Sequence, residues 1–125
     1  MRRVIAIVPD LFFATRIAAT AKALGVDLAL APLVRAADMI AAAPPALVLL
    51  DLHAPGDPLA LVRALKADAS TASIPVVGFY SHVETALRTS ALAAGIDAAL
   101  PRSAFVTRLA GLLAGEVDSH TGPQP

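Results

Sequence analysis

The sequence contains no cysteine, and this absence excludes several classes of function together. Without a thiol the chain forms no disulfide, no thiolate metal site and no cysteine nucleophile. Charged residues are also scarce, at 16% of the 125 residues, and the ten basic residues balance the ten acidic ones. Because no basic stripe stands out, we expect neither nucleic acid nor an anionic membrane surface as a direct partner.

Long hydrophobic runs are missing as well, although 57% of the residues are hydrophobic. A bilayer span needs about 20 consecutive apolar residues, and charged residues or prolines interrupt each apolar run here well before that length. The stretch between Arg3 and Pro9 is too short for the core of a signal peptide. We therefore expect a soluble cytoplasmic protein with one domain over residues 1–115 and a flexible polar tail over residues 116–125.

Short apolar runs alternate along the chain with segments of helical periodicity. The runs predict strands at 4–8, 26–31, 46–50, 74–80 and 96–100, and the periodic segments predict helices at 11–24, 33–43, 59–68, 81–94 and from 103 to near 115. Continuous apolar runs are typical of strands that are buried on both faces of a parallel sheet. The sequence thus predicts an α/β fold, a flavodoxin-like doubly wound (βα)5 sandwich with the common strand order 2-1-3-4-5.

Two aspartates follow the first and third predicted strands. Asp10 comes just after the first strand, and Asp51 ends the most apolar run in the chain. Neighbouring strands lie about 4.8 Å apart, so in this strand order both carboxylates would face one small volume. Carboxylate oxygens suit Mg²⁺, and aspartate can accept a phosphoryl group covalently. The alternative for Asp51 is a turn-forming residue that caps the following loop.

Three segments in this order resemble the response-regulator receiver family. Residues 47–56 are similar to its phosphoacceptor strand and loop, residues 73–77 to its fourth strand, and residues 95–102 to its fifth-strand segment. The likeness extends from Arg3 to about Gly115. It implies a stand-alone receiver-like domain that works in two-component phosphorelay signalling.

The resemblance assigns roles to individual residues. Asp51 takes the phosphoacceptor position, and Asp10, Asp51 and the backbone carbonyl of His53 take the positions of the Mg²⁺ ligands. A sensor histidine kinase or phosphotransfer protein is the implied donor. A downstream protein would contact the surface of the fourth helix, fifth strand and fifth helix, and dimerisation is compatible with this picture. No enzymatic activity is expected beyond phosphorylation and dephosphorylation of Asp51.

Several positions depart from the family pattern. Pro9 replaces the first of two adjacent acids, which removes one water-mediated contact to the metal. Tyr80, followed by Ser81, occupies the position of a small hydroxyl residue at the switch, and its alternative role is that of an amphipathic ring anchored at the strand end. Arg102 replaces a lysine that contacts phosphate or carboxylate. A permanent bond from Arg102 to Asp51 would hold the site in one state; alternatively, Arg102 is an exposed cation.

Other polar residues receive structural interpretations. His53, His82 and His120 lack the spacing of metal ligands and are expected on the surface. Helix capping is expected of Asp10, Asp57 and Ser103, and backbone freedom of Gly56 and Gly78.

The departures leave a second hypothesis open, a phosphorylation-independent pseudo-receiver that acts as a protein-interaction module. A small enzyme that uses the Asp10/Asp51 cleft is the weakest alternative, because the sequence offers no further acid, base or nucleophile for it.

Overall fold

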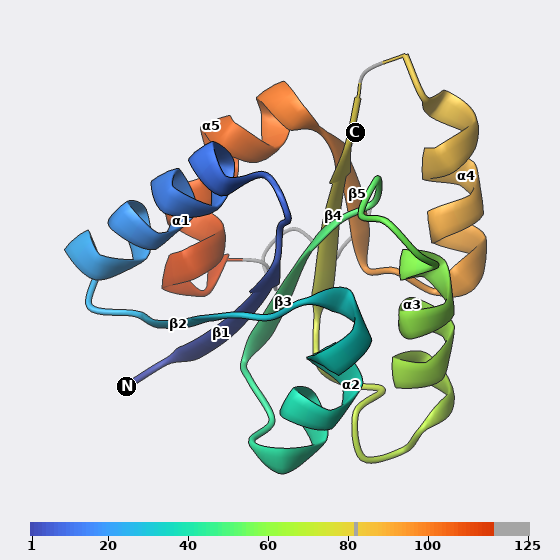
Figure 1. Ribbon diagram of the computed structural model, residues 1–125, viewed down its shortest axis with the longest axis horizontal. Helices are drawn as coiled ribbons and strands as arrows, with labels where there is room; N and C mark the ends of the chain where they lie inside the picture. The colour runs from blue at the N-terminus through green and yellow to red at the C-terminus, as the bar shows by residue number, and fades with distance from the viewer. Residues whose placement is uncertain (82, 117–125) are drawn as a thin grey trace.

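A five-stranded parallel sheet forms the centre of the molecule (Figure 1). The structure is a computed structural model and describes residues 1–81 and 83–116. Its strands are β1 (Arg3–Ile7), β2 (Asp27–Leu30), β3 (Leu47–Asp51), β4 (Val76–Tyr80) and β5 (Ala98–Pro101). They pair in the order β2-β1-β3-β4-β5. The predicted α/β class and strand order are therefore confirmed.

Five helices cover the two faces of the sheet. They are α1 (Leu11–Ala23), α2 (Leu33–Ala42), α3 (Pro58–Ala67), α4 (Thr85–Ala94) and α5 (Arg102–Ala114). Figure 1 shows α1 and α5 on one face and α2, α3 and α4 on the other. Each layer encloses its own cluster of buried apolar side chains, and alternate residues of the central strands contribute to each cluster. The sheet is thus buried on both sides, as the continuous apolar runs predicted.

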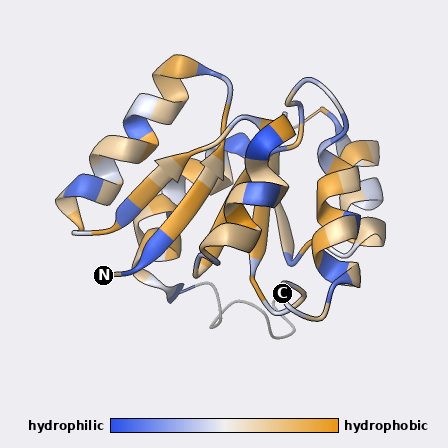
Figure 2. Cartoon of the chain, turned by 60° about the horizontal axis from the view of Figure 1, so that its bottom comes forward, coloured by the Kyte–Doolittle hydropathy of each residue, from blue (hydrophilic) through white to orange (hydrophobic). Residues whose placement is uncertain are grey.

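The central strand β3 explains why Asp51 lies where it does. Leu47 to Leu50 are completely buried, and Figure 2 shows the hydrophobic colouring of the strands. β3 pairs with β1 in a register that sets Ile7 beside Leu50. Asp51 is the first residue of β3 to reach solvent, and it is partly exposed. Burial of the aliphatic residues therefore holds the carboxylate at the carboxyl edge of the sheet.

Most helix ends agree with those predicted from the sequence, but two of the predictions were wrong. The carboxylates of Asp10 and Asp57 accept backbone N–H groups at the starts of α1 and α3, as predicted. Ser103, however, caps no helix, because α5 begins one residue earlier at Arg102, after Pro101. Similarly, α4 begins at Thr85 and not at residue 81, because a turn precedes it in which the Glu84 N–H bonds the Ser81 carbonyl at 2.8 Å.

The two glycines that were expected to provide backbone freedom differ in their roles. Gly56 does adopt a positive φ, of 104°. Gly78 has no positive φ, but a Cβ at this position would lie 2.8 Å from the Ile96 side chain and 3.0 Å from that of Leu52. Gly78 is therefore required for close packing of β4, and the prediction of backbone freedom there was wrong.

The expected tail over residues 116–125 lies, apart from Glu116, outside the described residues. Among the helices of the described chain, none is both long enough and apolar enough to cross a bilayer.

Candidate functional site

The ends of three neighbouring strands bring most of the predicted site residues together. Asp51 ends β3, Tyr80 ends β4, and Arg102 follows β5. Together with His53, Phe79 and Ser81 they line a cleft of about 220 Å³. Asp10 does not line this cleft, but it is joined to it through Arg102. The predicted site residues thus form one connected group at the carboxyl edge of the sheet.

Arg102 contacts Asp10. Its Nη2 lies 3.3 Å from Asp10 Oδ2, and its guanidinium lies 4.1 Å from the centre of the Phe13 ring, within reach of a cation–π interaction. The bond from Arg102 to Asp51 that the sequence suggested is not formed. Arg102 is nevertheless a carboxylate contact, with Asp10 as its partner.

Both carboxylate oxygens of Asp10 have hydrogen-bond partners. Oδ1 accepts the Phe13 N–H at 3.2 Å, and Oδ2 faces Arg102. The Phe13 N–H, followed by the hydrogen bond from Arg102, holds the pKa of Asp10 below its ordinary value of 3.8. Asp10 is therefore an ionised carboxylate that is already paired with the Arg102 guanidinium.

The Asp51 carboxylate has a different environment. Its Oδ1 accepts the backbone N–H of His53 at 2.8 Å, so the turn-forming role considered from the sequence is present. Within the described residues, no hydrogen bond or ion pair engages Oδ2. Because Asp51 also lines the cleft, its turn-forming role leaves one carboxylate oxygen available for chemistry.

His53 makes a contact that sequence reasoning missed. Its Nε2 accepts the Ser81 N–H at 3.1 Å, which ties the loop after β3 to the segment after β4. The expectation of a surface histidine is correct, since His53 is exposed, but the side chain also closes one side of the cleft. The two residues are 28 positions apart, so the only sequence signal was that both follow neighbouring parallel strands. His82 and His120 lie outside the described residues.

Tyr80 belongs to the hydrophobic core more than to the cleft. Its side chain is 4% exposed and packs within the cluster on the α2–α4 face, which also contains Ala91, Ile96 and Ala99. This burial agrees with the interpretation of Tyr80 as an anchored ring. Ser81, the next residue, is exposed.

The oxygen donors of the site have the chemistry that Mg²⁺ prefers. Asp51 and His53 line the cleft, so the Asp51 carboxylate and the His53 peptide carbonyl are the candidate ligands there, and Asp10 would supply a second carboxylate. Within the described chain, no group of three or more acidic or histidine side chains gathers at one point. Because Arg102 holds Asp10, a metal ion that used this carboxylate would first have to displace the guanidinium.

Comparison with known proteins gives a clear result for the fold. No protein-family model matches the sequence, and neither does any curated protein. Solved structures do match: the signal receiver domain of a DNA-binding response regulator from Colwellia psychrerythraea has a TM-score of 0.81 and 20% identity over 94% of this chain and 99% of that one. The fold is that of a response-regulator receiver domain.

Two other receiver-fold structures extend the comparison. The receiver domain of a sensor histidine kinase from Pseudomonas aeruginosa, with a magnesium ion in its active-site cleft, has a TM-score of 0.76 and 18% identity over 91% of this chain and 98% of that one. NtrX from Brucella abortus has a TM-score of 0.80 and 22% identity over 97% of this chain, which spans only 28% of NtrX. The receiver fold thus matches the family that the three sequence segments resemble.

Proposed function

We propose that this chain is a cytoplasmic receiver module of two-component phosphorelay signalling that accepts a phosphoryl group on Asp51. The observation that carries the proposal is the position of Asp51, which ends β3 after four completely buried residues and lines a cleft that Arg102 also lines. The receiver fold supports it, because ligands of such α/β sheets bind beyond the carboxyl ends of the strands. The donor is a sensor histidine kinase or phosphotransfer protein, and the surface of α4, β5 and α5 contacts the downstream protein.

The proposed chemistry is transfer of a phosphoryl group from a phosphohistidine. A carboxylate oxygen of Asp51 attacks phosphorus, the phosphorus–nitrogen bond breaks, and the leaving imidazole takes up a proton. Arg102 lines the same cleft and can donate hydrogen bonds to phosphoryl oxygens. Mg²⁺, when bound to Asp10, Asp51 and the His53 carbonyl, supplies positive charge beside the transferred group. No catalysis is proposed beyond phosphorylation and dephosphorylation of Asp51.

A phosphorylation-independent pseudo-receiver is the second candidate, and three observations favour it. Arg102 already neutralises Asp10, and Pro9 takes the place of a second acid. In addition, His53 occupies the Ser81 N–H, a donor at the rim of the cleft that could otherwise bind an anion. In this alternative the same surfaces bind proteins without a phosphoryl switch.

One experiment separates the two candidates. The protein is incubated with Mg²⁺ and either acetyl phosphate or beryllofluoride, and intact mass and tyrosine fluorescence are recorded. The chain has one tyrosine and no tryptophan, so the fluorescence comes from Tyr80 in the cleft wall. The first candidate predicts a mass gain of one phosphoryl group that Asp51→Asn abolishes.

A matched control is Asp57→Asn, which alters an exposed aspartate that caps α3 in the loop after β3. This variant should be modified like the unaltered protein. Absence of both a mass gain and a fluorescence change at saturating Mg²⁺ would favour the pseudo-receiver.

A further inference from the structure

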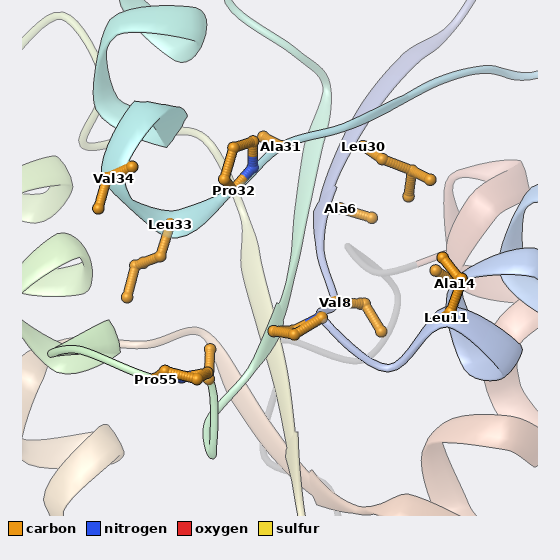
Figure 3. Close-up of a pocket in the computed structure, with 12 residues that line it drawn as sticks. Ala6, Val8, Leu11, Ala14, Leu30, Ala31, Pro32, Leu33, Val34 and Pro55 are labelled. Atoms are coloured by element: carbon orange, nitrogen blue, oxygen red, sulfur yellow. The ribbon is translucent and has the colours of Figure 1, made fainter.

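A second and larger hollow lies at the carboxyl edge of the sheet, between the starts of α1 and α2 (Figure 3). Its volume is about 460 Å³. We call it the α1–α2 groove. Only alanine, valine, leucine and proline line it: Ala6, Val8, Pro9, Leu11, Ala14, Leu30, Ala31, Pro32, Leu33, Val34, Ala54 and Pro55. Contiguous exposed apolar surface of this kind can mark a ligand-binding groove.

The side chains of the groove converge from several elements. Figure 3 shows Leu33 of α2 and Pro55 on one side, and Leu30 of β2 and Leu11 of α1 on the other. The groove is open to solvent, since Leu30 is 49% exposed and Val34, on the rim, is 90% exposed. No described segment of the chain fills it, so apolar surface remains in contact with water.

Its size and chemistry define what could bind. Clefts of roughly 300 to 1,000 Å³ accommodate small organic ligands, and this groove falls within that range. A charged ligand would lose hydration there without meeting a countercharge, whereas an apolar ligand would gain from burial. We propose that the α1–α2 groove binds a small, uncharged and mainly apolar molecule.

The groove adjoins the candidate phosphorylation site through the backbone. Pro9 lines the groove and Asp10 follows it, while Ala54 lines the groove and follows His53. The proline that removes an acid from the metal position therefore also completes an apolar wall. Ligand binding here requires no phosphoryl transfer, so the inference stands apart from the proposed function.

The test is a titration with N-phenyl-1-naphthylamine, an uncharged probe whose fluorescence rises in apolar surroundings, without Mg²⁺ or phosphodonor. We expect saturable binding of one probe per chain. Leu30→Asp should weaken it at least tenfold, and so should Pro9→Asp, because each places a carboxylate in the groove. Leu92→Asp is the matched control, because Leu92 on α4 is similarly exposed, at 41%, but lies outside the groove. Its affinity for the probe should be unchanged.

Circular dichroism of each variant establishes that the fold is retained, and amide chemical shifts locate the probe. Shifts confined to residues of α1, β2 and α2 around the groove would support the proposal. No saturable binding, equal loss in Leu92→Asp, or shifts centred on α4 would overturn it. A dimer in sedimentation would also overturn the proposal if the dimer excludes the probe and Leu30→Asp dissociates it. In that case a second copy of the chain would occupy the groove.

Discussion

The Asp10 carboxylate has a structural role at the start of α1 and also belongs to the candidate site. One oxygen caps α1 and the other meets Arg102, whose guanidinium also lies over Phe13. The cap and the ion pair favour the ionised form, and the pKa of Asp10 is lowered accordingly. The same contacts that stabilise the start of α1 therefore compete with any metal ion for this residue.

The lowered pKa of Asp10 makes its contribution to stability dependent on pH. Because the folded-state pKa lies below the ordinary value of 3.8, the contribution is fully present above about 3.8 and is lost as pH falls through the folded pKa. We predict that Asp10→Asn, which keeps a capping side chain, lowers the urea midpoint at neutral pH. The deficit should disappear in strongly acidic solution. An equal deficit at both pH values would show that the charge is not responsible.

Arg102 should weaken Mg²⁺ binding, since it neutralises a carboxylate that would be a ligand. A guanidinium at this distance repels a divalent cation and occupies a carboxylate oxygen that would otherwise bind it. We therefore predict that Arg102→Gln raises Mg²⁺ affinity severalfold, measured through Tyr80 fluorescence. Arg35→Gln, a substitution of an exposed arginine on α2, is the control and should leave the affinity unchanged. Lower affinity in Arg102→Gln would contradict the prediction.

At the scale of secondary structure elements, the sequence predicts all ten helices and strands and their order along the chain. The apolar runs suffice because each central strand is buried on both faces. The predicted ends of several elements were wrong, because short-range contacts determine where those elements begin or end. The start of α4 depends on the turn bond from Glu84 to Ser81, and nothing in the local composition distinguishes that turn from a first helical turn.

The candidate site was predictable in part for the same reason. Strand order alone brings Asp51, Tyr80 and Arg102 to one edge. The partner of Arg102 and the bond from His53 to Ser81 were not predictable, because each depends on how a side chain turns within a site whose backbone is already fixed.

A cluster around Lys66 and Asp97 joins three elements at the opposite edge of the sheet. Asp97 Oδ2 accepts from Lys66 Nζ of α3 and from the Val76 N–H at the start of β4, each at 2.7 Å. Lys66 also donates to the carbonyls of Ala72 and Ile74. The Lys66 and Asp97 side chains are only 16% and 32% exposed, so their hydrogen bonds are partly shielded from water.

We predict that Asp97→Ala lowers the free energy of unfolding by about 1 to 3 kcal/mol, because it leaves the Lys66 ammonium and a backbone N–H without this acceptor. Asp27→Ala is the comparison: its 3.8 Å pair with Arg3 is more exposed, and exposed pairs contribute about 0 to 1 kcal/mol. Urea denaturation measures both variants. Equal losses would mean that the Asp97 cluster is no stronger than an exposed ion pair.

At the scale of the whole molecule, the two apolar layers share one sheet and should unfold together. Phe13, Phe79 and Phe105 form an aromatic group in the α1/α5 layer, with ring centres 4.7 to 5.8 Å apart. Tyr80, the only tyrosine, lies in the other layer. Each central strand contributes side chains to both layers, so loss of one layer exposes the strands that support the other.

This arrangement predicts that Phe105→Ala, a change in the α1/α5 layer, also shifts the unfolding transition that is reported by Tyr80 in the opposite layer. Removal of a fully buried phenylalanine costs about 3 to 5 kcal/mol. In urea, circular dichroism and Tyr80 fluorescence should report one coincident transition, displaced equally in the variant. If the Tyr80 transition kept its midpoint while circular dichroism shifted, the layers would unfold separately. A structural change at Asp51 would then not be transmitted through the sheet to both helical layers together.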